Sequence, residues 1–294
     1  MKQQSKERED PMKDTLRDRF IREMTVRGLS QRTQNSYLLN LTLLVKRTGN
    51  HPAKLTTDDL RNYFAWMVNV HGVEPSTYRQ HLVAVKLFFK TVLKREEKFF
   101  EYAGPRKRRK LPVVLTVDET QRLLNALHVP RIRSAAVVTY SCGLRSSEVI
   151  SLSVEWITAE AGSLHIHNAK GGLDRVVPLP KRTLSILKEH WYRERPSGKL
   201  LFESPHHSRS TLAGDTLRKA VKAAANEVGI NRPICLHTLR HCYASHLMEY
   251  GVPLPLIQRW MGHKSITTTT LYTQLTTPAL ERAHSALERL TEAL

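Results

Sequence analysis

The stretch Glu101–Leu111 (EYAGPRKRRKL) constrains the fold more than any other part of this sequence, because it divides the chain in two. It joins a Gly-Pro break to a run of basic residues, Arg106, Lys107, Arg108, Arg109 and Lys110. Glycine and proline interrupt regular structure, and a block of like charges is not buried in a core. The 294 residues suffice for about two domains. We therefore predict an N-terminal domain over 1–100, a basic interdomain linker over 101–111, a second domain over 112–277 and a C-terminal helical tail over 278–294.

The N-terminal part has the pattern of short amphipathic helices. Ser30 is a candidate N-cap for a helix that ends at Thr48, before Gly49, and Thr56 and Asp59 have the spacing of a capping box. A further helix is expected over Thr15–Arg27. None has enough apolar surface to be stable alone, so we predict one small bundle with Leu, Phe and Trp side chains inside. Two apolar runs at helical spacing support it: Leu60, Phe64, Met67 and Val68, then Tyr78, Leu82, Val85, Phe89 and Val92 in a helix from Ser76.

The part after the linker mixes helices with one strand signal. SLHIHNA and RVVPL alternate on either side of Gly171-Gly172, so Gly162–Pro180 is predicted to contain a β-hairpin. The fold class is therefore mainly α with a small antiparallel β-sheet in the second domain. Helices are predicted over Val117–Leu127, Arg131–Ser141, Leu184–Arg193, Thr216–Val228, Thr238–Tyr250 and Leu254–Met261.

The charge of the chain restricts its partners. Lys and Arg number 46 against 27 Asp and Glu, which gives a net charge of +19, and both parts carry an excess of cations. Nucleic acid is the commonest polyanionic partner, although a ribosomal or membrane-surface protein would have the same sign. No apolar run has the length of a membrane span or forms a signal peptide, and three cysteines fit a reducing compartment better than a disulfide framework. We expect a cytoplasmic protein with a polyanionic partner, and charge alone does not name its function.

The basic run in the linker has two possible interpretations. A charge run is often a solvated loop. Pro105–Leu111, however, would reach about 23 Å when extended, which exceeds the roughly 12 Å width of a DNA major groove. We favour a linker whose residues Arg106–Lys110 contact DNA.

Arginine, lysine and histidine recur in the second part at places where helices and strands are expected to end. In TYSCGLRSSEV a helix is expected to end at Gly143, with Arg145 in the turn and Ser146 or Ser147 capping the next helix. In NAKGGLDR the hairpin tip carries Lys170. A guanidinium fixed between two helix ends offers two parallel donors, which suit the oxygens of a phosphate.

Two further motifs follow near the C-terminus. In HTLRHCYASHL, Thr238 is expected to cap a helix whose first turn holds Arg240 and His241, where free backbone N–H groups favour an anion. In MGHKSITTTTLYT, Gly262 ends a helix, His263 follows on a loop, and Tyr272 comes nine residues later. Taken singly, each of these residues is more often a surface or structural residue than a catalytic one.

In combination, these motifs resemble the tyrosine recombinase (phage integrase) family. The strings GLRSSE, KGG followed by R, HTLRHCYASHL and GHKSITTTTLYT match the catalytic motifs of the family over 111–277. Before position 111 the resemblance is one of architecture, a small helical DNA-binding domain ahead of a catalytic domain. The resemblance implies that the two domains clamp a DNA duplex.

The resemblance also implies a role for each motif residue. Two arginines, with a histidine, would hold the scissile phosphate, and a tyrosine would attack it to give a 3′-phosphotyrosyl link. A lysine would protonate the leaving 5′ oxygen, a second histidine would act as acid or base, and a carboxylate would orient a neighbour. The catalytic positions are Arg145, Lys170, His237, Arg240, His263 and Tyr272, and the orienting carboxylate is Glu148.

The chemistry of these residue types fits such a reaction without a cofactor. A phenol, with a pKa of about 10, is a moderate nucleophile and a good leaving group, which suits reversible transfer without ATP. Fixed cations can stabilise the transition state without a metal, and the sequence has no Walker-type phosphate loop. Cys235, His237, His241 and Cys242 lie close in sequence, but a second Cys pair is missing, so we expect no zinc site.

Two other functions stay open from the sequence: DNA relaxation by a type IB topoisomerase, and DNA binding without catalysis. The resemblance favours site-specific recombination, for integration, excision, resolution or inversion of DNA. It implies double-stranded DNA with paired inverted binding sites and a homotetramer on two duplexes. The tail could pack on its own domain, but the family pattern favours docking between protomers through a seam of Leu280, Ala283, Leu287, Leu290 and Leu294.

Overall fold

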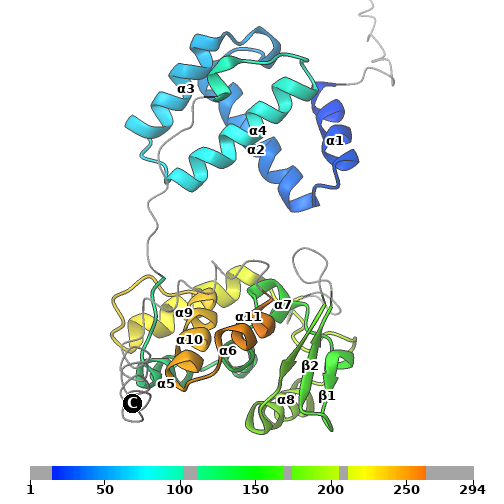
Figure 1. Ribbon diagram of the computed structural model, residues 1–294, viewed down its shortest axis with the longest axis vertical. Helices are drawn as coiled ribbons and strands as arrows, with labels where there is room; N and C mark the ends of the chain where they lie inside the picture. The colour runs from blue at the N-terminus through cyan, green and yellow to red at the C-terminus, as the bar shows by residue number, and fades with distance from the viewer. Residues whose placement is uncertain (1–14, 102–111, 168–173, 205–210, 263–294) are drawn as a thin grey trace, which may run out of the picture. The chain divides into compact units, whose positions relative to one another are not determined.

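The computed structural model describes residues 15–101, 112–167, 174–204 and 211–262. The chain divides into two compact units, Met1–Arg109 and Lys110–Leu294, and each is described by itself (Figure 1). Helices dominate both, and one small antiparallel sheet lies in the second, which confirms the predicted fold class. No helix of the described residues is long and apolar enough to cross a membrane.

Within residues 15–101, four helices form the N-terminal unit: α1 (Leu16–Val26), α2 (Gln31–Thr48), α3 (Thr57–Asn69) and α4 (Pro75–Thr91). The predicted end signals are confirmed. Ser30 caps α2 through its side chain, Gly49 ends it in the left-handed conformation at φ +70°, and Thr56 and Asp59 form a reciprocal capping box. Short 3-10 turns lie at Pro52–Lys54 and Lys98–Glu101.

Aromatic rings fill the core of this unit. Phe20 and Phe88 meet edge to face at 5.3 Å between ring centroids, and Phe64 lies 5.1 Å from Tyr78. Two apolar side chains of this unit are less buried than the core of the predicted bundle. Val68 is 41% exposed, because the run at 67 and 68 crosses from the buried face of α3 to its solvent face. The predicted interior Trp is represented by Trp66, which is only half-buried and lies beneath the Arg47 guanidinium.

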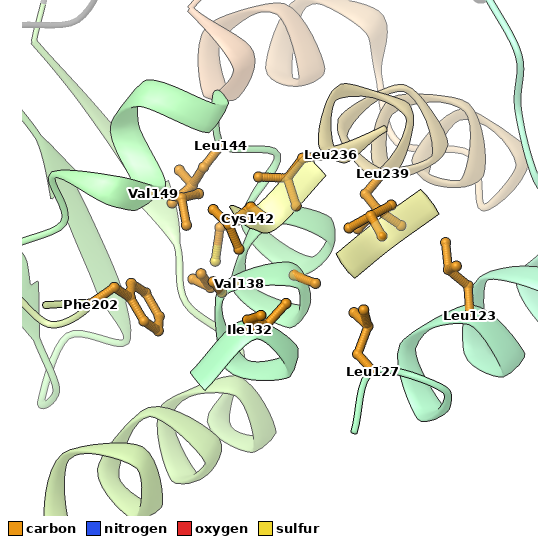
Figure 2. Close-up of a cluster of buried hydrophobic side chains, with 14 of the residues drawn as sticks. Leu123, Leu127, Ile132, Val138, Cys142, Leu144, Val149, Phe202, Leu236 and Leu239 are labelled. Carbon is orange, nitrogen blue, oxygen red and sulfur yellow. The ribbon is translucent and has the colours of Figure 1, made fainter. Parts of the chain in front are cut away.

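The second unit packs its helices around a core that α6 crosses (Figure 2). Figure 2 shows side chains from α5, α6 and α10 converging there, among them Leu123, Val138 and Leu239, all fully buried. The helices of this unit are α5 (Val117–Asn125), α6 (Pro130–Cys142), α7 (Ser146–Ile150), α8 (Lys181–Glu194), α9 (Gly214–Glu227), α10 (Leu236–Glu249) and α11 (Leu254–Met261).

The sheet has the strand order β1-β2-β3, with β1 at Ile157–Thr158, β2 at Ser163–Ile166 and β3 at Arg175–Pro178. The predicted hairpin strands β2 and β3 pair antiparallel, with Ile166 opposite Arg175, while β1 was not predicted. The turn at Gly171-Gly172 lies outside the described residues. The register places Arg175 on the inward face, where it is buried.

The N-cap residues of α7 and α10 differ from prediction. The N-cap of α7 is Arg145 rather than Ser146 or Ser147, because the Glu148 carboxylate accepts the Arg145 backbone N–H in place of a serine side chain. The N-cap of α10 is Cys235 rather than Thr238, since Thr238 lies at the third helical position and accepts the Cys235 N–H. Arg240 and His241 therefore lie in the second turn of α10, beyond the free N–H groups of the first.

Candidate active site

The tight connection between α6 and α7 fixes the first predicted site residue, Arg145. Gly143 ends α6 at φ +60°, and a Cβ at this position would lie 2.5 Å from Cδ1 of Tyr243. Both the backbone conformation and the close ring therefore require glycine. Arg145 follows two residues later, with its side chain 19% exposed, so it stays partly open to solvent.

Glu148 lies at the centre of a cluster of arginines. Its Oε1 accepts from Nη1 of Arg145 at 2.7 Å, and its carboxylate accepts two parallel bonds from Arg175 at 2.8 and 2.7 Å. Burial raises the pKa of this carboxyl, but the hydrogen bonds and charge of Arg175 and then of Arg145 outweigh burial and lower it to about 2. Glu148 is therefore ionised at neutral pH. The predicted orienting carboxylate does contact Arg145.

Arg175 is the arginine that follows KGG in the matched motif, and the sequence assigned it no role. Its Nε donates to the Trp260 carbonyl at 2.6 Å while both Nη atoms hold Glu148, and its side chain is 5% exposed. One sequence signal could have found it: in RVVPL, the alternation that buries Val177 also buries Arg175. A charge at an inward strand position requires a buried partner.

Arg240 is buried more completely than the sequence suggested. It is 1% exposed in α10, and it donates to the Gly143 carbonyl at 2.6 Å and to the Met261 carbonyl at 2.5 Å. Its Nη1 also lies 3.9 Å from Oε2 of Glu148. Arg145, Arg175 and Arg240 thus surround one carboxylate, and the cluster carries two more positive than negative charges.

The three arginines also converge on the C-terminal end of α11. Consecutive carbonyls accept one bond each: Trp260 from Arg175, Met261 from Arg240 and Gly262 from Nη2 of Arg145 at 2.7 Å. The last carbonyls of a helix have no partner inside it, and the helix dipole makes this end attractive to cations. The arrangement fixes Gly262, the residue directly before His263.

Two histidines border the cluster on α10. His237 was predicted, whereas His241, one turn later, was not, and the two rings meet edge to face at 4.5 Å. Desolvation by burial, and to a smaller extent the positive charges of Arg240 and Arg145, lowers the pKa of His237. Burial, followed by His237 and Arg240, lowers the pKa of His241 to about 4. Both rings are therefore neutral at pH 7, and the exposed His237 can accept a proton.

The cysteines have structural surroundings. Cys142 and Cys242 are buried, and Sγ of Cys242 accepts the Leu115 N–H at 3.2 Å. Within the described residues, no three His, Cys, Asp or Glu side chains are grouped so that they could hold a metal ion.

Several predicted site residues fall outside the described residues: Lys170, His263, Tyr272, and the linker residues Arg106, Lys107, Arg108, Arg109 and Lys110. Of the tyrosines that could replace Tyr272 as nucleophile, Tyr243 is 7% exposed and packs against Gly143, and burial raises its pKa. Tyr250 is 74% exposed at the end of α10.

Comparison with known proteins decides the family. Residues 113–278 match the phage integrase family, and residues 16–98 match the N-terminal SAM-like domain of phage integrases. This chain belongs to the tyrosine recombinases of the phage integrase family. The resemblance seen in its motifs is thereby confirmed, and membership favours a recombinase enzyme over the topoisomerase and the non-catalytic binder.

Relatives and solved structures agree with this membership. An integrase/recombinase of Sinorhizobium fredii is 30% identical over 94% of this chain and 89% of its own length. The tyrosine recombinase XerD of Oceanobacillus iheyensis is 31% identical over 87% of this chain and 91% of its own. In fold, the recombinase resembles a lambda integrase dimer bound to a core site, with a TM-score of 0.70, 19% identity and coverage of 87% and 93%. It also resembles XerH bound to its difH substrate, with a TM-score of 0.67, 24% identity and coverage of 92% and 84%.

Proposed function

We propose that this recombinase cleaves and rejoins DNA at specific sites through a covalent bond to Tyr272. The observation that carries the proposal is the convergence of Arg145 and Arg240 on the end of α11, with Gly262 fixed ten residues before Tyr272. Two guanidinium groups at one place can bind two oxygens of one phosphate. The excess positive charge around Glu148 would stabilise the charge that builds up on phosphorus oxygens in the transition state.

In this proposal the Tyr272 oxygen attacks the scissile phosphorus. A bond forms between the phenolic oxygen and phosphorus, the bond from phosphorus to the 5′ oxygen breaks, and a 3′-phosphotyrosyl link and a free 5′ hydroxyl result. The phenol proton passes to His237, whose ring is neutral at pH 7, and Lys170 gives a proton to the 5′ oxygen. His263 adds a hydrogen bond to the phosphate. Attack by the 5′ hydroxyl of another strand reverses the step, so the phosphodiester is restored without ATP.

The two arginines enter this step in different states. Two of the five N–H groups of Arg145 bond to Glu148 and Gly262, and its side chain is partly exposed, so it can reach a phosphate as it stands. Arg240 is 1% exposed. We therefore propose that DNA binding uncovers one side of its guanidinium, while its bonds to Gly143 and Met261 keep it in place.

We further propose that the helical unit before the linker binds DNA together with the catalytic unit, and that Arg106–Lys110 contact the backbone between them. The net charge of +19 supports a partner with many phosphates. The proposed substrate is double-stranded DNA in the cytoplasm, with paired inverted sites and a tetramer on two duplexes. The lambda integrase structures include a tetramer bound to a Holliday junction.

The tail over 278–294 is proposed to dock between protomers. Its apolar seam at Leu280, Ala283, Leu287, Leu290 and Leu294 would couple assembly to the nearby Tyr272. Deleting residues 279–294 should leave binding to a single half-site nearly unchanged and remove cooperative binding to a full site in gel-shift titrations. Unchanged cooperativity with a lower melting temperature would show that the tail packs on its own domain.

Replacing Tyr272 by phenylalanine tests the function. The probe is a duplex that the wild-type chain enriches from a random-sequence pool. Tyr272→Phe should bind it normally and form no SDS-resistant protein–DNA adduct, because phenylalanine has no nucleophilic oxygen. The matched control is Tyr250→Phe, which removes an exposed hydroxyl and should form the adduct at the wild-type rate. An adduct with Tyr272→Phe would contradict the proposal.

A further inference from the structure

We propose that Arg175 is a positioning residue for DNA cleavage, which holds Glu148 and through it Arg145, and which ties strand β3 to the end of α11. The inference rests on the cleavage function proposed above and assigns a role to a residue outside the six catalytic positions. Arg175 is not proposed to touch DNA, since its side chain is 5% exposed. Its effect passes through its three described hydrogen bonds.

The Arg175 guanidinium holds its partners through three nitrogens. Its two Nη atoms bind the two oxygens of Glu148, and its Nε donates to Trp260. One planar group thus joins three elements: β3, α7 and α11. A lysine has a single nitrogen without a planar fork, so it cannot hold the carboxylate through two parallel bonds and reach the carbonyl as well.

Arg145 depends on the same carboxylate. Glu148 accepts both the backbone N–H and Nη1 of Arg145, each at 2.7 Å. Arg145 and Arg175 then bond to carbonyls of the same helix end, Gly262 and Trp260. If Arg175 is replaced, the Glu148 carboxylate can rotate, and the Trp260 carbonyl at the end of α11 loses its bond to Arg175. The two groups that hold the Arg145 guanidinium, Glu148 and the Gly262 carbonyl, are then fixed less firmly.

The side chain of Arg175 also packs against Gly262. A Cβ at position 262 would lie 3.0 Å from Cδ of Arg175, and Gly262 adopts φ +62°. The stem of Arg175 therefore packs directly on the last residue of the α11 end. This contact adds a steric restraint to the hydrogen bonds, and it lies beside the carbonyl to which Arg145 donates.

The energetics argue for positioning over stability. Burying an ion pair removes both charges from water, and replacing a whole buried pair with apolar side chains is often neutral or stabilising. A buried Glu–Arg pair is therefore weak evidence of a stability role. A fork that fixes a catalytic arginine gives a specific reason for the pair, because catalytic groups must be held in their productive geometry by their neighbours.

The test measures single-turnover adduct formation on the enriched duplex with Arg175→Lys and Arg175→Met. Both variants should bind the duplex like the wild type and form adduct about 10- to 100-fold more slowly, by analogy with the loss seen when a residue that orients a metal ligand is replaced. Arg131→Lys is the control, because Arg131 is also partly buried and paired, with Glu194, away from the cluster. It should keep the wild-type rate.

A pH profile separates positioning from lower stability. Arg145, Arg175 and Arg240 are the charged side chains that the described part of the structure places against Glu148. In the wild type, Glu148 stays ionised across the assay range. In Arg175→Met, Glu148 is still buried but has lost one strong partner, so it should bind a proton as pH falls. The rate of adduct formation by this variant should therefore decline in acid, whereas the wild-type rate should not. Arg175→Met combined with Glu148→Gln should lack this decline.

The outcomes are distinct. Slow adduct formation with normal binding and the new acid dependence supports the inference. Wild-type rates in both Arg175 variants, or reductions that match the unfolded fraction in melting curves without acid dependence, would overturn it. If the wild-type chain itself forms no adduct, the proposed function fails instead.

Discussion

The two units of the chain bury different polar side chains. In the described part of the N-terminal unit the buried polar residues are neutral: Gln34, Asn40, Thr91 and His81, whose pKa is lowered by burial. The second unit buries Glu148, Arg175 and Arg240 as one ionic cluster. The first unit is thus held together mainly by aromatic packing, whereas the second carries buried charge inside a larger apolar core.

This difference suits a division of roles between the two units. Buried charges cost desolvation free energy, and a fold gains little stability from them. The function proposed above would account for their place in the second unit, beside the end of α11, because a reacting phosphate requires rigid cations. In the same proposal, the N-terminal unit would contribute a stable fold and positive charge for DNA binding. The predictions below test this division, from the largest expected effect to the smallest.

Removing a core ring should destabilise the N-terminal unit most. Phe64 is 2% exposed and packs against Tyr78 and Phe99, so Phe64→Ala should lower the free energy of unfolding by about 3–5 kcal/mol. Urea unfolding of the whole chain measures the decrease. Val83→Ala, at a position 51% exposed, is the control and should change it by less than about 0.5 kcal/mol. Equal decreases would contradict an aromatic core as the main source of stability.

Removing a phosphate-binding arginine should affect catalysis and leave binding intact. Arg145→Ala should slow adduct formation by about 10²–10³-fold, as removal of one transition-state donor typically does. Affinity for the duplex should change little, because the chain has 46 Lys and Arg residues and the loss of one leaves many to share the contacts with the backbone. Single-turnover kinetics and gel shifts measure the two effects. A parallel fall in both would make Arg145 an ordinary binding residue.

Acid should remove the contribution of Glu148 to stability. The pKa of Glu148 in the folded chain, about 2, lies below its ordinary value of 4.5. Its ionised form therefore stabilises the fold fully above about pH 4.5, and this contribution is lost as pH falls towards 2. The difference in melting temperature between the wild type and Glu148→Gln should shrink over that range. A difference that stays constant with pH would contradict a tightly paired carboxylate.

Neutralising the linker should give the smallest effect. Replacing Arg106–Lys110 with glutamine should weaken binding to every duplex and reduce the slope of log affinity against log salt. The reduction should be up to about 0.9 for each phosphate that the linker no longer neutralises. Titrations at several salt concentrations measure this slope. If it does not change, the basic run is solvated.

Local patterns predicted most helices of both units. α11 (Leu254–Met261) has the predicted bounds, and the Thr56–Asp59 capping box is present, because apolar spacing and caps act within a few residues. Arg175 escaped prediction because its partners, Glu148 and Trp260, lie 27 and 85 residues away. The start of α10 was misplaced for a local reason: the Thr238 side chain accepts the Cys235 N–H from the third helical position, as the second half of a capping box, and Thr238 is not the N-cap itself. Contacts between distant segments are set by packing, which a local pattern does not contain.

Direct identification of the tyrosine that would bond to DNA is the most direct test of the proposed function. Wild-type adduct, digested with nuclease and trypsin, can be analysed by mass spectrometry for a peptide that carries a nucleotide. Cleavage after Lys264 and Arg282 yields SITTTTLYTQLTTPALER, in which Tyr272 is the single tyrosine, whereas Tyr243 and Tyr250 share another peptide. We expect the nucleotide on the Tyr272 peptide. A nucleotide on the peptide with Tyr243 and Tyr250 would contradict the assignment of Tyr272 as nucleophile.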